Sequence, residues 1–166
     1  MSNLFLPEHC KLVDAVPGIS DTFAEVTFDY VSLKNTHMAW IVILLTQVGD
    51  QGTGHETLIQ PQVATSVLPA GATSITFATD IWSNEDTAAT DMLVKRTSAT
   101  QYEVAGDVAT KMVVFKIDPS DVVAQGVAYD CIGCTIESSK QLNLVAGLYV
   151  LQQRYAQDVL PAAITD

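Results

Sequence analysis

The sequence predicts an all-β fold, a two-sheet antiparallel sandwich with jelly-roll-like connections, in one domain that covers residues 1–166. Val, Ile and Thr recur in short runs separated by turn residues, a pattern typical of antiparallel sandwiches and barrels. No internal repeat and no Gly/Ser-rich linker marks a second domain. Hydrophobic residues make up 48% of the chain and charged residues only 16%, a composition that excludes intrinsic disorder.

The first expected strands follow an irregular N-terminal arm, residues 1–17, which contains prolines. The alternating run Phe23–Leu33 predicts a strand, and Lys34–His37 predicts the turn after it. The next run, Met38–Val48, is apolar on both faces and lacks a helix-capping signal. We expect it to be a strand that is covered on two sides.

The middle of the chain contains three further strand patterns. In Thr57–Leu68 the run is interrupted by Pro61, which cannot donate a ladder hydrogen bond and therefore predicts an edge strand or a bulge. Ser74–Trp82 alternates between apolar and polar residues, which predicts a half-buried strand. Asp91–Arg96 and Gln101–Val104 predict a short polar hairpin.

The last third of the chain is the most regular. Thr110–Ile117 alternates as a strand, and Asp118–Ala124 predicts one helical turn because an aspartate that can cap a helix precedes a proline. Val127–Glu137 and Leu142–Gln152 predict the final two strands. Residues 155–166 form the expected C-terminal tail, which contains a proline. In total, eight or nine strands are expected.

The charge balance limits the classes of partner. Nineteen acids and eight bases give a formal net charge of -11, so a nucleic-acid backbone would be repelled. The longest apolar stretch, Met38–Leu45, has eight residues, whereas a membrane-spanning helix needs about 20. The start of the sequence has no basic residue before its apolar run and no small-residue cleavage pattern, so we expect no secretory signal.

The three cysteines are expected to be reduced core residues. Cys131 and Cys134 form a CxxC motif within a predicted strand, so their side chains should point to opposite faces. That placement argues against a shared metal ion and against a disulfide between them. The histidines show no paired ligand spacing that could complete a zinc site, and we expect no cofactor.

No catalytic motif is present in the sequence. It contains no GxSxG elbow, no HExxH pair and no cupin-like histidine cluster, and no candidate base lies beside a candidate nucleophile. We therefore expect that the protein is not an enzyme. The densest group of acids, in Asp80–Asp91, lacks the spacing of an EF-hand and its closing glutamate, which favours a solvated acidic face; a calcium ion in this loop is the open alternative.

Several apolar groups have no obvious place in a lone sandwich. Met38–Leu45 and Leu142–Val150 together offer more apolar strand surface than two packed sheets need, which predicts a homo-oligomer, a dimer or a trimer. Trp82 ends its strand beside an acidic loop, where an aromatic ring can contact a partner. Both terminal arms also carry apolar residues. The expected partner contacts are Leu4, Phe5, Leu6, Trp82, Tyr155, Val159, Leu160 and Ile164.

The stretch MVVFKIDPSDVVAQGVAYDCIGCTI, residues 112–136, together with the C-terminal LYVLQQRYAQDVLPAAITD, resembles virion proteins of tailed bacteriophages that decorate or cement the capsid shell. The resemblance covers about the last third of the chain. It implies a small, non-catalytic β-sandwich that assembles as a dimer or trimer on the major capsid protein. The implied location is the exterior of the capsid, after synthesis in the host cytoplasm.

Three other classes of function stay open from the sequence. They are another phage structural component, such as a tail or connector protein, a carbohydrate-binding β-sandwich module, and a small metal-dependent enzyme. A carbohydrate binder would expose several coplanar aromatic rings, and the candidates for these are Trp82, Tyr102 and Tyr155.

Overall fold

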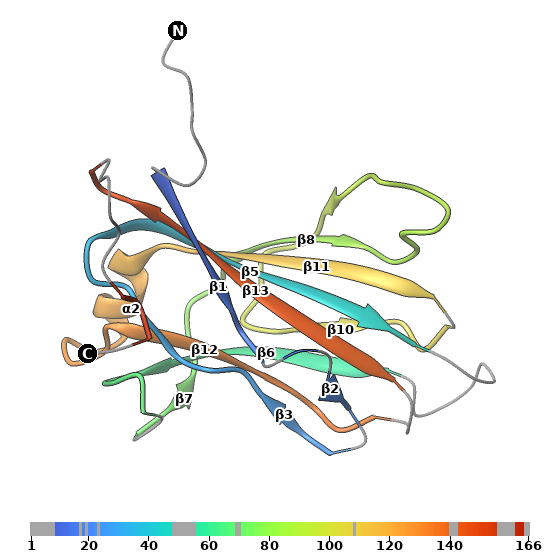
Figure 1. Ribbon diagram of the computed structural model, residues 1–166, viewed down its shortest axis with the longest axis horizontal. Helices are drawn as coiled ribbons and strands as arrows, with labels where there is room; N and C mark the ends of the chain where they lie inside the picture. Colours follow the sequence, from blue (N-terminus) through green and yellow to red (C-terminus); the bar gives the residue numbers. More distant parts are fainter. Residues whose placement is uncertain are drawn as a thin grey trace, which may run out of the picture.

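Two antiparallel β-sheets pack against each other, which confirms the all-β two-sheet sandwich (Figure 1). The computed structural model describes residues 9–16, 18, 20–22, 24–47, 56–68, 71–107, 109–139, 143–155 and 162–164. The sheets are built from strands that are distant in sequence, so most of the chain must be in place before either sheet is complete.

The first sheet has the strand order β1-β13-β5-β11-β8-β9, with β2 paired to β13. Its strands are β1 (Cys10–Asp14), β2 (Ser20–Asp21), β5 (Thr36–Thr46), β8 (Asp80–Asn84), β9 (Val94–Lys95), β11 (Thr110–Ile117) and β13 (Leu144–Gln153). The longest strand, β5, lies between β13 and β11 and pairs antiparallel with both. The strands predicted at Met38–Val48, Thr110–Ile117 and Leu142–Gln152 are therefore confirmed, with small shifts at their ends. The irregular arm predicted over residues 1–17 is wrong for Cys10–Asp14, which pair with β13 as β1.

The second sheet has the order β10-β6-β12-β3, with β4 paired to β12 and β7 paired to β6. Its strands are β3 (Val26–Thr27), β4 (Val31–Ser32), β6 (Thr57–Ala64), β7 (Thr73–Ser74), β10 (Tyr102–Val104) and β12 (Cys131–Ile136). The helix α2 (Pro119–Gln125) connects β11 to β12. The side chain of Asp118 caps it by accepting a 2.8 Å hydrogen bond from the Ser120 amide, so the predicted helical turn is confirmed.

The prediction of one continuous strand at Phe23–Leu33 is wrong, because the described part of this run forms two short strands, β3 and β4. Between them the backbone changes partners. The amide of Phe28 donates to Cys134 in the second sheet, and the next amide, that of Asp29, donates to Ala15 beside the first sheet. A chain that bonds to both sheets within two residues cannot extend a ladder in either.

Two other predictions, of one strand and of one hairpin, are wrong for a related reason. Ser74–Trp82 is divided between β7 in the second sheet and β8 in the first, and Ile75 is buried in the core where the chain crosses. The segments around β9 and β10 do not form a hairpin with each other, because β9 pairs with β8 and β10 pairs with β6. Local alternation gives the strand character of such segments but not the sheet that they join.

Pro61 lies in an interior strand, so its predicted place on an edge strand is wrong. Strand β6 pairs with β12 along one side. On its other side the neighbour changes, because β10 pairs with Thr57–Ile59 and β7 pairs with Gln62–Val63. The proline lies at the change of neighbour, where the missing amide proton interrupts no ladder.

The core lies between the inner faces of the two sheets. Ile41, Ile43 and Phe115 have no exposed surface, and the rings of Phe28 and Tyr149 meet edge to face with centroids 6.5 Å apart. Burial raises the pKa of Tyr149 well above its ordinary value, and its hydroxyl donates a 2.8 Å hydrogen bond to the carbonyl of Asp29. The inner face of the first sheet is therefore fully packed.

Candidate functional site

The outer face of the first sheet is unusually apolar for a surface. Along β5 the side chains alternate, with Ile41 and Ile43 in the core and Val42 and Leu44 pointing outward. Leu44 is 42% exposed and Leu12, on β1, is 51% exposed. Within this chain, the outward side chains of β5 from Met38 to Thr46 are half-buried, except the exposed Leu44. Whether a partner covers this side stays a prediction.

The strand register arranges the outward side chains in three rows that run across the sheet, which we call the apolar face. The first row contains Leu12, Val150, Trp40, Lys116 and Asp80. The second row contains Asp14, Leu148, Val42, Val114, Trp82 and Lys95. The third row contains Ala146, Leu44, Met112 and Asn84. Residues directly opposite each other in antiparallel strands share a face, so these rows form one continuous surface.

A hollow of about 210 Å³ indents this surface near one end of β5. Leu44, Leu144 and Ala146 form its apolar wall, and Thr46 and Thr110 lie at its border. Such a hollow can accept one apolar side chain of moderate size.

Trp82 lies on the apolar face near its β9 edge. The ammonium of Lys95 is 5.4 Å from the centroid of its ring and 3.1 Å from a carboxylate oxygen of Asp80. Hydrogen bonds from Lys95 and then Ser98 lower the pKa of Asp80. The structure thus places Trp82 on the surface where the sequence predicted a partner contact.

The outer face of the second sheet is mostly polar, apart from Leu58 and a small buried cluster of Tyr30, Ala64 and Cys131. Its outward side chains include Gln60, Gln62 and Thr135, which bond to one another and to neighbours: the Gln62 amide donates to the Thr135 hydroxyl at 3.4 Å, and the Gln60 amide donates to Gln101 at 3.2 Å. Glu137 follows at the end of β12 and is exposed. The two outer faces of the sandwich therefore differ in chemistry, one being apolar and the other rich in amides.

A buried lysine between the sheets has three hydrogen-bond acceptors. The side chain of Lys111 on β11 has no exposed surface. Its ammonium donates to Glu85 at 3.2 Å, to the Ala105 carbonyl at 2.9 Å, and to Asp107. These three acceptors match the three protons of an ammonium, so the buried cation is fully bonded.

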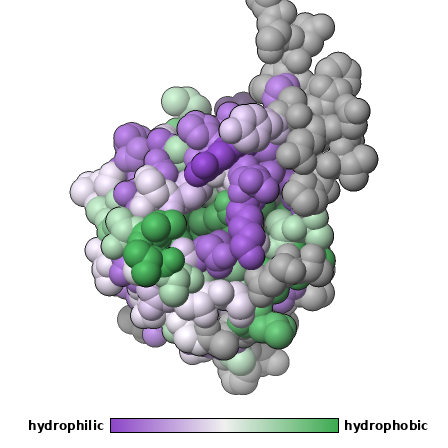
Figure 2. All heavy atoms as spheres, turned by 90° about the vertical axis from the view of Figure 1, so that its left-hand side faces the viewer, coloured by the Kyte–Doolittle hydropathy of each residue, from purple (hydrophilic) through white to green (hydrophobic). Residues whose placement is uncertain are grey.

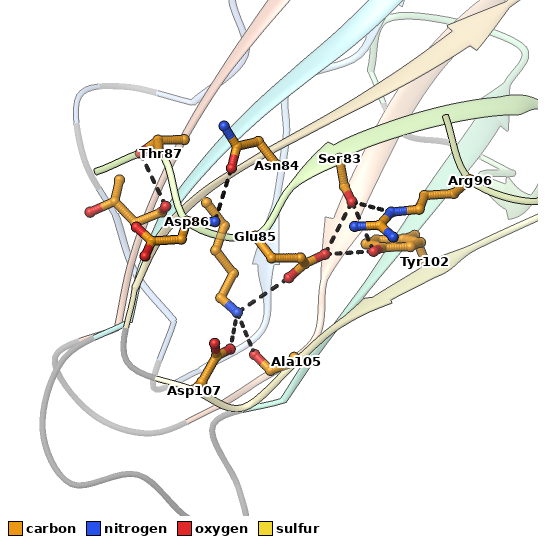
Figure 3. A network of polar contacts seen from close by, with 11 residues as sticks. Ser83, Asn84, Glu85, Asp86, Thr87, Arg96, Tyr102, Ala105 and Asp107 are labelled. Carbon is orange, nitrogen blue, oxygen red and sulfur yellow. Dashed lines mark hydrogen bonds and ion pairs between the residues drawn. The ribbon is translucent and has the colours of Figure 1, made fainter. Parts of the chain in front are cut away.

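The same network extends to the second sheet through Glu85 (Figure 3). The Tyr102 hydroxyl donates to Glu85 at 2.5 Å and also lies 2.9 Å from the Ser83 hydroxyl, which accepts a 2.7 Å hydrogen bond from Arg96. Burial, followed by the hydrogen bond to Glu85, raises the pKa of Tyr102. The network ties β8 and β11 to β10, and so joins the two sheets at this end.

Sequence reasoning missed this network, although a signal for it was present. In Thr110–Ile117 the side chain of Lys111 points to the same side of the strand as Val113 and Phe115, which alternation places in the core. A lysine in a buried phase indicates acidic partners nearby. Those partners are distant in sequence or beyond a turn, so the pattern could not identify them.

Three of the four acids of Asp80–Asp91 have separate protein partners. Asp80 pairs with Lys95, Glu85 with Lys111, and Asp86 accepts hydrogen bonds from the amides of Ala88 and Ala89. Across the described residues, no group of three or more His, Cys, Asp and Glu side chains is arranged to hold a metal ion. The described carboxylates of this loop do not converge on one point, so they give no support to the calcium alternative.

The cysteines lie as the spacing predicted. Cys134 belongs to the main core, whereas Cys131 packs on the other side of the second sheet with Tyr30 and Ala64. None of the three cysteines, all of which lie among the described residues, forms a disulfide, and burial raises the pKa of Cys134 far above its ordinary value. A thiol held in its neutral form is a poor nucleophile and a poor metal ligand.

A mixed polar and apolar hollow of about 500 Å³ lies at the end of the sandwich beside α2. Figure 2 looks onto this end, where hydrophilic side chains border a recessed apolar floor. The charged residues at its border are already bonded: Lys34 is 3.7 Å from Asp130, and Arg154 donates to the Thr36 carbonyl at 3.3 Å.

The predicted contacts in the terminal arms are described only in part. Tyr155 is 71% exposed and Ile164 is 59% exposed. The other predicted contacts of the tail, Val159 and Leu160, lie outside the described residues. The predicted contacts of the N-terminal arm, Leu4, Phe5 and Leu6, also lie outside them. Ala163 is buried, and its carbonyl accepts a 2.8 Å hydrogen bond from Ser32 in β4, so part of the tail packs on its own chain.

Comparisons with models of protein families, with curated proteins and with solved structures found no match to this chain. Among the helices of the described residues, none has the length and apolar character needed to cross a membrane.

Proposed function

We propose that this chain is a structural subunit that acts by protein contact, and that it decorates and stabilises the shell of a bacteriophage capsid. The observation that carries the contact role is the apolar face, which lies on the opposite side of the sandwich from an amide-rich face. A subunit that attaches to an assembly needs one adhesive side and one solvated side. The two outer faces match these needs.

The size and continuity of the apolar face support contact with protein. Leu12, Leu44 and the ring of Trp82 are exposed or half-buried in adjacent rows, whereas monomeric proteins seldom expose large continuous apolar patches. Covering such side chains contributes about 25 cal/mol per Å² of apolar surface removed from water. Aromatic side chains at the centre of such a patch contribute most to binding in many interfaces.

The polar clusters support a structural role. Lys111, Glu85, Tyr102 and Ser83 satisfy one another inside the sandwich, and this bonding stiffens the join between the sheets. The sequence resemblance to capsid decoration proteins supplies the identity of the assembly within this proposal.

The two arms leave the sandwich at the same end, which supports a joint contact with the shell. Strand β1 starts at Cys10, and its first residue pairs with Gln152 near the end of β13. Residues 1–9 and 154–166 therefore continue from neighbouring points. One partner surface can contact both arms, and the exposed Tyr155 and Ile164 add apolar groups to that contact.

The proposal is tested by sedimentation of the purified chain with shells assembled from the major capsid protein of the phage that encodes it. We expect the chain to pellet with shells in a saturable, fixed ratio. Deleting Met1–Leu6 or Val159–Asp166 should weaken pelleting while the sandwich stays folded, as circular dichroism can verify. A full-length chain that remains in the supernatant at every shell concentration would contradict the decoration function.

A further inference from the structure

We infer that the apolar face binds a second copy of this chain, with a two-fold axis that runs parallel to the strands of the first sheet. The inference rests on the part of the proposed function that makes this face a protein contact, and it adds the partner. Three features of the face lead to it: the order of side chains in its rows, its balance of charge, and its size.

The middle row has an acidic end and a basic end. Asp14 lies exposed on β1 at one edge of the sheet, and Lys95 lies exposed on β9 at the other edge. The four residues between them are all apolar or aromatic: Leu148, Val42, Val114 and Trp82. A surface with this order is complementary to itself when it is turned end for end.

A two-fold axis between β5 and β11 produces that turn. Each row of one copy then faces the same row of the other copy. The β1 edge of one copy faces the β9 edge of the other, as in the isologous contact of a symmetric dimer. Asp14 of each copy then faces Lys95 of the other, and Leu148 faces Trp82. Two face-to-face sheets packed in this way have aligned strands.

The same axis determines the pairs in the neighbouring rows, where it also sets Val150 against Asp80 and Ala146 against Asn84. In the first row, Trp40 faces Lys116 of the second copy, an arrangement in which an ammonium can lie over an indole ring. In the third row, Leu44 faces Met112, so the methionine approaches the hollow beside Leu44. Methionine is flexible and fills irregular apolar spaces. The axis thus pairs each row with itself and places a side chain near the hollow.

The charge of the face favours a second copy despite the acidity of the chain. The whole chain has a formal net charge of -11, so two copies repel each other over most approaches. The three rows of the apolar face contain Asp14, Asp80, Lys95 and Lys116 as their charged residues, two acids and two bases. Two copies that meet through these rows bring no net charge together there.

The size of the face suits a reversible dimer. The three rows contain fifteen residues, and strands about 4.8 Å apart with about 6.8 Å between successive outward residues give a footprint of roughly 500 Å² on each copy. The dimer would then bury about 1,000 Å² in total, which is the size of weak, transient interfaces. We expect a dimer that dissociates on dilution.

Sedimentation velocity of the full chain over a wide concentration series is the first test. The wild-type chain should change from monomer to dimer as its concentration rises. Val114→Asp, in the middle row, should stay monomeric at all concentrations. The matched control is Thr135→Asp, an outward position on the polar face, which should dimerise as the wild type does.

Exchanging the charges at the two ends of the middle row tests the axis itself. This test changes no apolar residue of the face. Asp14→Lys alone brings lysine against Lys95, and Lys95→Glu alone brings glutamate against Asp14, so each variant should dimerise about tenfold more weakly. When the two variants are mixed, both contacts of the mixed dimer join opposite charges. The mixture should therefore recover dimerisation, and equal weakness before and after mixing would overturn the proposed axis.

The outcomes separate this inference from the proposed function. A wild-type chain that is monomeric at every concentration, or a dimer that Val114→Asp leaves intact, overturns the inference. A monomer that pellets with shells, and loses pelleting in Val114→Asp, assigns the face to the shell and also overturns it. A dimer that fails to pellet with shells leaves the inference standing and removes the decoration function.

Discussion

Replacing the buried Lys111 with methionine should destabilise the sandwich without emptying the site. Lys111→Met keeps the length of the side chain but removes the charge and the three protons that Glu85, Asp107 and the Ala105 carbonyl accept. The control is Lys116→Met on the same strand, which removes a half-buried lysine from the outer face. The two variants differ in which side of the sheet loses a charge.

The expected loss of unfolding free energy depends on how well water can solvate the acids that Lys111 leaves behind. Removing one partner of a fully buried pair costs about 3 to 5 kcal/mol. The side chains of Glu85 and Asp107 are 26% and 52% exposed, so water can solvate part of the charge that Lys111 leaves behind. We therefore expect Lys111→Met to lower the free energy of unfolding by about 2 to 3 kcal/mol, and Lys116→Met to change it by less than about 0.5 kcal/mol.

Urea titration at neutral pH measures this difference, and a pH series adds a second readout. The hydrogen bond from Lys111 lowers the pKa of Asp107 in the folded protein. A lowered carboxyl pKa stabilises the fold above the unfolded value of about 3.9, and this contribution is lost as the pH falls through the folded pKa. The gap between wild type and Lys111→Met should narrow below about pH 4. Equal unfolding midpoints for the two lysine variants at neutral pH would refute the account of the network.

Three further changes test the core, the cysteines and the tail. Ile43→Asp should prevent soluble folding because it buries an unpaired carboxylate, whereas Val42→Asp on the outer face should stay folded; expression and circular dichroism compare these neighbours. Cys131→Ala and Cys134→Ala should each cost about 1 to 2 kcal/mol in urea titration, and stoichiometric zinc by mass spectrometry would contradict the reading of idle thiols. Deleting Val159–Asp166 should leave the melting transition cooperative but weaken shell binding, and unchanged binding would move the contact elsewhere.

The regular parts of the fold could be predicted from the sequence because their signals are local. Alternation identified β11 to the residue, and the Asp118 and Pro119 pair identified the start of α2. The short strands could not be assigned in the same way. Strands β8 and β10 take their places from the distant partners β11 and β6, and β7 and β9, with two residues each, carry too little pattern to select a partner.

The candidate surface was predictable in its composition and not in its layout. Apolar residues on both sides of the strands that contain Val42 and Leu148 indicated surplus apolar surface. The alignment of these two residues with Asp14 and Lys95 depends on five strand pairings and could not be read from any one segment. The balanced charges of the face became visible only with the register.

The fluorescence of the two tryptophans is the most direct measurement of whether protein covers the apolar face. Trp40 and Trp82 are the two tryptophans of the chain, and both lie in rows of that face. On concentration we predict a blue shift of the emission and weaker quenching by acrylamide, because a second copy excludes water and quencher from both rings. The Val114→Asp variant should keep the emission and quenching of the dilute wild type. If emission and quenching are the same at all concentrations and in the presence of shells, the face stays open to solvent and the central claim is contradicted.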